Sequence, residues 1–213
     1  MEALSHKVFE SLKANILNFT YLPGVRLSDD EIATELQVSR TPVREALNRL
    51  SEQGLVEAKS KRGFRVKSFS EKEIEDLYIL RATLECLAVK LTIGRMNPAI
   101  EKQLKFSLAD YPRIIKSGDL WGFSLADTKF HDMIAQLSGN AALHETLRNL
   151  YDKIHIIRRY DHIRSGSMER TYQGHLKIIE FMLKHDVKKS EKNMSKHILD
   201  SLKIILKIKQ QKI

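Results

Sequence analysis

An aspartate and three histidines in the second half of the chain have the residue types of a divalent-metal site. Asp127 and His131 lie four residues apart, so in a helix both side chains lie on one face. His175 and His197 follow in two later segments with helical periodicity. Three imidazoles and one carboxylate can bind zinc, and the same set can bind nickel or manganese. The pattern alone also fits hydrogen-bonded core histidines or surface histidines, and both interpretations stay open at this point.

The neighbours of these residues favour a buried cluster. Phe130 and Ile134 lie beside the first pair, and Ile198 and Leu202 lie beside His197. Buried imidazoles and a buried carboxylate need polar partners. A metal ion would supply one common partner to all four side chains.

A second group of polar residues, near the N-terminus, has the pattern of a DNA-reading helix. Arg40 and Arg44 lie four residues apart and therefore share a helix face. An arginine can donate two hydrogen bonds to one guanine base. Ser39 and Thr41 lie beside the arginines and can contact phosphate oxygens. Arginines at a helix start also occur on solvated surfaces, so a helical hairpin without DNA contacts is the alternative.

Two short predicted helices and a hairpin would position these arginines. Ser28 and Glu31 form a capping box that starts the first helix, and Ser39 caps the second. Alternating apolar and polar residues predict two strands, 55–58 and 63–66. This order is that of a winged helix-turn-helix, whose second helix enters the major groove of DNA.

The tip of the predicted hairpin is basic. Five cations lie within nine residues, with no acidic residue among them: Lys59, Lys61, Arg62, Arg65 and Lys67. Gly63 lies at this tip and lets the backbone approach a ligand closely. We therefore expect Arg62 and Gly63 to contact phosphates or the minor groove.

The remainder of the chain is helical in its periodicity. The pattern changes near residues 67–71, and the helices predicted after it cover 71–94, 98–116, 119–138, 140–164, 168–185 and 187–209. The expected fold class is mainly α. Residues 1–68 are predicted to form a winged helix-turn-helix of three helices and a small β-hairpin, and residues 69–213 an all-α bundle of about six helices.

Composition indicates the partners and the compartment. The formal charge of +9 favours a polyanion such as double-stranded DNA. The single cysteine, Cys86, cannot form an internal disulfide, which suits a reducing cytoplasm. The sequence contains no apolar run of about 20 residues and no pattern of a signal peptide, so we expect a cytoplasmic protein without membrane contact.

The first unit resembles the GntR family of bacterial regulators. The resemblance is carried by the run from Ser39 to Leu47, SRTPVREAL, together with Pro23-Gly24 before it and Gly63-Phe64 after it. It implies a dimer that binds a palindromic operator through Arg40, Thr41, Arg44 and Gly63. Some relatives carry a DNA-contacting basic residue on the first helix of the motif, where this chain has Asp29-Asp30-Glu31. No contact is therefore expected there.

Residues 71–209 resemble the helical FCD domain of the FadR subfamily. This resemblance implies that Asp127, His131, His175 and His197 hold a metal ion and that a small organic acid completes its coordination. It also implies that Arg81 binds the carboxylate of that acid, since a guanidinium fork suits a carboxylate. The alternative is an ion pair of Arg81 with Glu85, four residues along the same helix.

These features together predict a ligand-responsive transcription regulator and not an enzyme. A repressor is the first expectation, and whether the ligand releases or promotes DNA binding stays open. The regulator would act as a homodimer on DNA, with a divalent metal ion and a small organic acid as effector. Two other classes compete with this hypothesis. One is a metal-dependent hydrolase built on the histidines, and the other is an architectural DNA-binding protein with a purely structural metal.

Overall fold

The computed structural model describes residues 2–59, 63–158 and 167–211. Contacts along the chain divide it into two compact units, one ending at Ser70 and one beginning at Glu71. Each unit has its own apolar core. None of the helices in the described ranges combines the length and the apolar composition that a membrane span requires.

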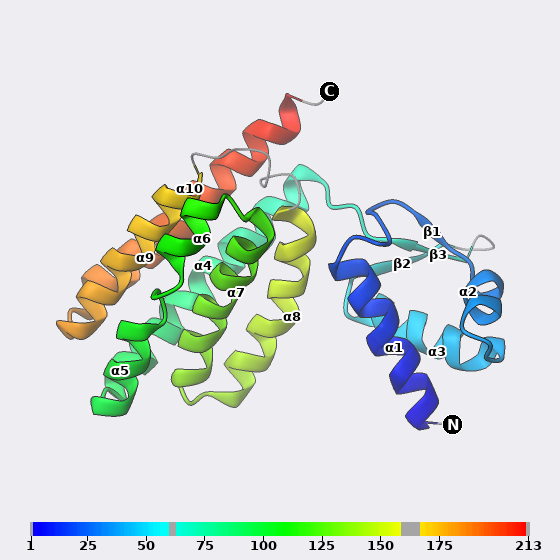
Figure 1. The fold of residues 1–213 in the computed structure, drawn as a ribbon, viewed down its shortest axis with the longest axis horizontal. Helices are drawn as coiled ribbons and strands as arrows, with labels where there is room; N and C mark the ends of the chain where they lie inside the picture. The colour runs from blue at the N-terminus through cyan, green and yellow to red at the C-terminus, as the bar shows by residue number, and fades with distance from the viewer. Residues whose placement is uncertain (1, 60–62, 159–166, 212–213) are drawn as a thin grey trace. The chain divides into compact units, whose positions relative to one another are not determined.

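The first unit contains three helices and a small antiparallel sheet (Figure 1). Its elements, in chain order, are α1 (Glu2–Leu17), β1 (Arg26–Leu27), α2 (Asp29–Glu35), α3 (Arg40–Glu52), β2 (Val56–Lys59) and β3 (Gly63–Val66). Helix α1 packs on α3, and Leu12 and Leu47 are fully buried in the resulting core. Ser28 caps α2 as the sequence predicts, since its hydroxyl accepts a hydrogen bond from the backbone N–H of Glu31 at 3.3 Å.

The predicted hairpin is present and gains a third strand. Strands β2 and β3 pair antiparallel with Val56 opposite Val66, and β1 pairs with the other edge of β3. Gly63 begins β3 at a φ of 78°, a conformation that glycine adopts without strain. Arg62 at the predicted tip lies outside the described residues. Strand β1 has two residues, too few for an alternating pattern to reveal it.

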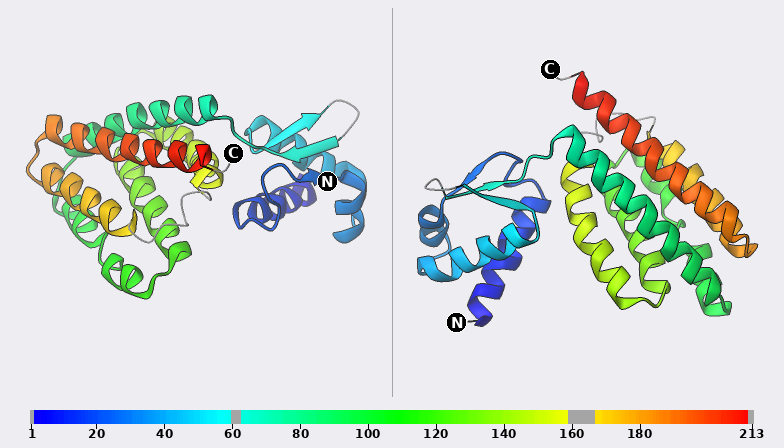
Figure 2. Two further views of the ribbon diagram at one scale, coloured as in Figure 1. Left: turned by 90° about the horizontal axis from the view of Figure 1, so that it is seen from above. Right: turned by 180° about the vertical axis from the view of Figure 1, so that it is seen from behind.

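In the part that the structure describes, the second unit consists of helices only. They are α4 (Glu71–Gly94), α5 (Pro98–Phe106), α6 (Tyr111–Ser117), α7 (Leu120–Leu137), α8 (Ala141–Arg158), α9 (Ser167–Leu183) and α10 (Val187–Gln210). Helix α4 is central to this unit, because α7, α8, α9 and α10 all contact it. Figure 2 shows α4 and α10 lying side by side along most of their length. The predicted fold class, mainly α with a winged helix-turn-helix followed by a helical bundle, is confirmed.

One predicted helix is two helices in the structure. Where the periodicity predicts a single helix over 98–116, α5 ends at Phe106 and α6 starts at Tyr111. Pro112 lies in the first turn of α6, where its missing N–H costs no hydrogen bond. In the interior of a continuous helix the same proline would have removed a hydrogen bond. The periodicity hides this break because both helices bury their apolar faces in the same core.

Candidate metal centre and DNA-contacting surface

Three helices bring the four predicted metal ligands together. Asp127 and His131 come from α7, His175 from α9 and His197 from α10, and one ligand atom of each lies within 4.8 Å of the other three. The Nε2 atom of His175 lies 3.4 Å from Oδ1 of Asp127 and 3.2 Å from Nε2 of His197. Ligands about 2.0–2.1 Å from a tetrahedral zinc ion would lie about 3.4 Å from one another. The spacing of these atoms therefore fits a single ion.

Buried atoms without partners provide a second test of this fit. Asp127, His131 and His175 are each at most 1% exposed. Oδ1 of Asp127 and Nε2 of His131 have no hydrogen-bond partner within the described ranges, although buried polar atoms normally have one. These two atoms lie 3.9 Å apart and face the same point. The donor set thus lacks what a divalent cation would supply.

The electrostatics of the cluster favour the protonation states that bind metal. Burial lowers the pKa of His175 well below its ordinary value, and His197 lowers it further. Burial and the nearby His131 lower the pKa of His197 to about 3. Although burial alone would raise the pKa of Asp127, Arg158 and His131 hold it well below its usual value. His175 and His197 are therefore neutral and the carboxylate is charged, as metal coordination requires.

Glu85 of α4 joins the site, although the sequence indicated only its pairing with Arg81. Its carboxylate is buried and accepts a hydrogen bond from Nε of Arg81 at 2.5 Å. Its second oxygen contacts Nδ1 of His131. Burial alone would raise the pKa of Glu85, but Arg81 and His131 lower it to about 2, so the carboxylate can only accept. His131 therefore donates from Nδ1 and keeps Nε2 for the centre, an arrangement common among metal-binding histidines.

Arg158 of α8 has a comparable effect on Asp127. Its Nη1 donates to Oδ2 of Asp127, so only Oδ1 of that carboxylate is directed at the histidines. Arg158 is buried, and so is Arg81. Both buried guanidinium groups thus have a carboxylate partner, as buried charges require. Arg159 and Tyr160, which follow Arg158, lie outside the described residues.

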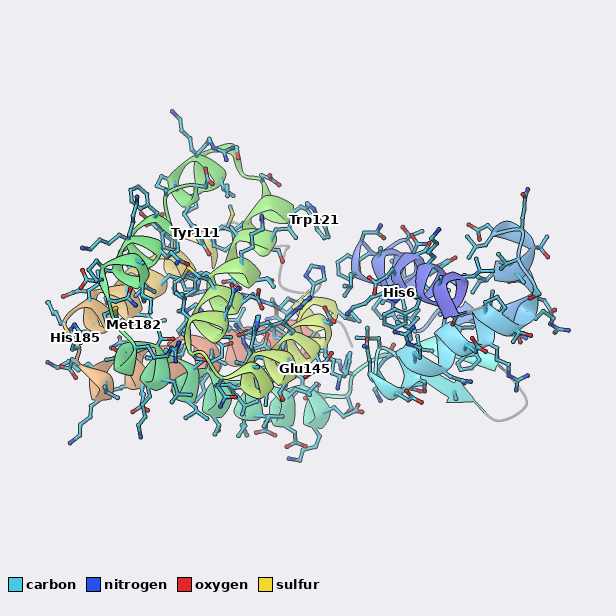
Figure 3. The ribbon with its side chains drawn as sticks, turned by 90° about the horizontal axis from the view of Figure 1, so that it is seen from below. His6, Tyr111, Trp121, Glu145, Met182 and His185 are labelled. Carbon is cyan, nitrogen blue, oxygen red and sulfur yellow. The ribbon has the colours of Figure 1, made fainter. Side chains whose placement is uncertain are left out.

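Three buried hydroxyl groups surround the centre. Tyr111, Tyr151 and Ser124 place hydroxyl oxygens in the interior with no hydrogen-bond partner in the part of the chain that the structure describes. The ring of Tyr111 lies 5.6 Å from the ring of His175, and the ring of Tyr151 lies 6.4 Å from that of His131. Figure 3 shows Tyr111 among the helices of this unit. We call these three side-chain hydroxyls the buried hydroxyls.

The predicted DNA-contacting residues lie on the open side of α3. Val43, Leu47 and Leu50 bury one face of the helix, while Arg40 and Arg44 are exposed on the other. Ser39 lies at the N-cap position of α3, but its side chain makes no cap hydrogen bond within the described residues, contrary to the predicted cap. Ser39 and Thr41 are both exposed. Arg40, Thr41 and Arg44 line one shallow depression together with Asp29, Glu45 and Asn48.

The acidic first turn of α2 lies beside this surface. Asp30 forms an exposed ion pair with Arg40 through Oδ2 and Nη2. Exposed pairs of this kind contribute little stability, about 0–1 kcal/mol. The pair therefore costs little to open. Gly63 is exposed at the start of β3 in the same unit.

Comparison with family models separates the chain into the same two parts. The model described as "Bacterial regulatory proteins, gntR family" matches residues 4–66. The model described as "FCD domain" matches residues 76–200.

Curated relatives match along most of the chain. It is 31% identical over 193 residues to the uncharacterized HTH-type transcriptional regulator YdhC of Bacillus subtilis, covering 90% of this chain and 84% of the relative. It is 25% identical over 212 residues to the HTH-type transcriptional repressor RspR of Escherichia coli, covering 99% and 92%. It is 32% identical over 168 residues to the Nta operon transcriptional regulator of Aminobacter aminovorans, covering 78% and 77%.

Solved structures share the fold. E. coli McbR/YncC superimposes with a TM-score of 0.81 at 21% identity, over 96% of this chain and 97% of that protein. A putative GntR transcriptional regulator from Rhodococcus gives a TM-score of 0.78 at 25% identity, over 95% and 97%.

Proposed function

The chain belongs to the GntR family of bacterial transcription regulators with an FCD domain, and from this premise we propose that it is a repressor controlled by a small organic acid. The repressor would bind a palindromic operator as a homodimer. The acid would bind over a divalent metal ion held by Asp127, His131, His175 and His197, with zinc as the first candidate and nickel or manganese as others. Its site of action would be the DNA of the cytoplasm.

The convergence of four ligand atoms from three helices is the observation on which this proposal depends. It is supported by the unpartnered Oδ1 of Asp127 and Nε2 of His131. When bound, the ion would supply a Lewis-acidic position for a carboxylate oxygen. The arrangement of the helices that carry the metal ligands would then depend on whether the site is occupied.

The surroundings of the centre support an organic acid as the effector. The buried hydroxyls can donate hydrogen bonds to a carboxylate, or exchange hydrogen bonds with hydroxyls of the ligand. Arg81 engages Glu85 through Nε, and its remaining donors are suited to a carboxylate. The buried guanidinium and carboxylate groups already balance one another, so a divalent ion adds positive charge that an anion would offset.

DNA binding is assigned to residues 1–68, and sensing and dimerisation to residues 69–213. The exposed face of α3 supports base or phosphate contacts from Ser39, Arg40, Thr41 and Arg44, and Gly63 with Arg62 would contact the backbone or the minor groove. A ligand can shift the operator affinity only by the difference in its affinity for the two states of the regulator.

The experiment measures operator affinity of the metal-loaded protein with and without a panel of organic acids. We expect one acid to weaken operator binding about 5- to 150-fold, the usual range of coupling between two sites. The same acid should have no effect on the His175→Ala variant. An acid that binds the metal-loaded protein without changing operator affinity would refute the coupling and leave a structural metal as the explanation.

The DNA-contacting surface is tested separately. Replacement of Arg40 and Arg44 by alanine should abolish the preference for the operator over random DNA while the protein stays folded. Arg148→Ala, at an exposed arginine of α8, is the matched control and should bind as the unmodified chain does. Metal-dependent hydrolysis is not proposed, because the family and its relatives are transcription regulators.

A further inference from the structure

A pocket of about 220 Å³ opens between α9 and α10, and neither Tyr111, Tyr151 nor Ser124 is among its lining residues. Arg170 and Lys177 of α9 and Lys196 of α10 line it, together with Gly174 and His197. On α9, Arg170, Gly174 and Lys177 are spaced by four and three positions and therefore lie on one face. On α10, Asn193, Lys196 and Asp200 are spaced by three and four positions and likewise lie on one face. The pocket thus lies between two facing helix surfaces and reaches one of the four candidate metal ligands.

Gly174 explains why the pocket reaches His197. A Cβ atom at this position would lie 2.8 Å from Nδ1 of His197, closer than two such atoms can approach. The glycine therefore lets the imidazole lie against α9 and leaves space beside the ring. Nε2 of the same imidazole points the other way, 3.2 Å from Nε2 of His175. One edge of His197 faces the centre and the other faces the pocket.

The pocket carries a surplus of positive charge. Among the described residues that line it, Asp200 is the only carboxylate, and it is already engaged by Lys196 and by Lys203, the latter at 3.3 Å. Arg170 and Lys177 form no ion pair within the described part of the chain. Two cations next to an imidazole edge favour an anionic ligand.

His197 differs from His131 in its outer hydrogen bond. His131 donates from Nδ1 to the carboxylate of Glu85. Nδ1 of His197 lies beside Gly174, and no carboxylate among the described residues accepts from it. A histidine that binds metal through Nε2 carries its proton on Nδ1 and usually donates it to a carboxylate, carbonyl or water.

We propose that the pocket between α9 and α10 binds a small oxyanion, a carboxylate or a tetrahedral anion, which Arg170 and Lys177 hold and which accepts a hydrogen bond from Nδ1–H of His197. This site lies outside the centre and is separate from the position of the effector acid. An anion bound there holds the ring of His197 with Nε2 directed at the centre. It therefore raises the affinity of the centre for metal, and this second step rests on the metal site proposed above.

Anion binding is measured first, by calorimetry on the metal-free full-length chain at constant ionic strength. Sulfate is the tetrahedral probe and acetate the carboxylate probe, because both coordinate zinc weakly. We expect saturable binding of at least one probe. The probe with the higher affinity shows whether the natural ligand is a tetrahedral anion or a carboxylate. The Arg170→Gln, Lys177→Gln double variant should bind about tenfold more weakly or worse, since the loss of even one charge-assisted hydrogen bond has an effect of about this size.

The matched control replaces two exposed lysines of α10 that do not line the pocket, as Lys188→Gln, Lys192→Gln. It removes the same net charge and should bind the probe within about twofold of the unmodified chain. An equal loss of probe affinity in both double variants would overturn the proposal, and so would the absence of saturable binding of either probe. So would binding that survives in the pocket variant but disappears in His175→Ala, because the anion would then lie at the centre.

Coupling to the centre is measured second, as zinc affinity by competition with a chelator, with and without saturating probe. Zinc affinity should rise several-fold with the probe in the unmodified chain and in the lysine control, and stay constant in the pocket variant. An unchanged zinc affinity in the unmodified chain would refute the coupling. Failure to bind zinc at all would refute the metal centre, while the calorimetric result would still decide the anion site.

Discussion

At the scale of single residues, the centre consists of buried charges that already have partners and buried dipoles that have none. Arg81 pairs with Glu85 and Arg158 with Asp127, so the charged groups balance. The imidazole of His175 is kept neutral by burial. An ion that enters this set meets one available carboxylate oxygen of Asp127 and the ring nitrogens of the three histidines.

Glu85 is expected to tune metal affinity through His131. Glu85→Gln keeps the shape of the side chain and replaces a charged acceptor by a neutral amide, so His131 is oriented less firmly. We expect zinc affinity to fall about 10- to 100-fold, the usual effect of losing such an outer partner. Chelator competition measures the change.

The control for this prediction is Glu145→Gln, at an exposed glutamate of α8 that Figure 3 labels. It should leave zinc affinity unchanged. Unchanged zinc affinity in Glu85→Gln itself would show that the hydrogen bond to His131 has no part in metal binding.

The lowered pKa of His197 predicts how stability depends on pH in the metal-free protein. The ring stays neutral in the folded state down to a pH of about 3, whereas in the unfolded chain it takes up a proton below about 6.5. The contribution of the neutral His197 ring to the free energy of unfolding is therefore present above pH 6.5 and is lost as the pH falls toward 3. One such histidine lowers the free energy of unfolding by about 1–2 kcal/mol between pH 7 and pH 5.

Urea denaturation at pH 7 and pH 5 checks this value by comparing the unmodified chain with His197→Gln. The variant should lose less stability over this interval, whatever its stability at pH 7. His185→Asn serves as the control, because His185 is exposed at a φ of 55° that asparagine tolerates. An equal pH dependence in all three proteins would contradict the prediction.

At the scale of elements, the centre depends on how closely α9 and α10 approach each other. Gly174→Ala places a methyl group against the ring of His197. Separation of the helices or rotation of the ring should cost about 1–3 kcal/mol, as overpacking does. Zinc affinity should fall with stability, since the ring holds one ligand atom.

Gly94→Ala is the matched substitution, because a Cβ atom there meets nothing within 4 Å. Alanine is the better helix former, so this variant should be neutral or slightly stabilised. Thermal unfolding and chelator competition measure both variants. Equal stability of the two would show that the contact between Gly174 and His197 is not tight.

At the scale of the whole molecule, two compact units divide at Ser70 and Glu71, and the proposed ligands all belong to the second. A ligand that binds only the folded state stabilises the unit that contains its site. Removal of metal should therefore lower the unfolding temperature of the helical unit and leave that of the winged helix-turn-helix unchanged.

Differential scanning calorimetry of the full chain, before and after treatment with a chelator, checks this prediction. The His175→Ala variant should unfold at the chelated temperature in either condition. A chelator effect of the same size in this variant would assign the stabilising ion to another site.

The sequence by itself determined the elements and the types of the functional residues. The capped helices, the basic hairpin and the SRTPVREAL run follow from local spacing, because residues three or four apart in a helix share a face whatever surrounds them. The same reasoning placed Asp127 beside His131 and singled out His175 and His197 as further candidate ligands, and the resemblance to a known family implied that all four hold one metal ion. It missed the break between α5 and α6 and the short strand β1, which leave no periodic trace.

The tertiary structure alone decided which side chains support the ligands. Glu85 contacts a histidine 46 positions away, and Arg158 contacts an aspartate 31 positions away, so neither pair leaves a local pattern. The burial of the three hydroxyls and the pocket beside Gly174 likewise result from helices packed against one another. Periodicity fixes the face on which a residue lies, but the partner it meets depends on the packing of whole helices, which is set by the core as a unit.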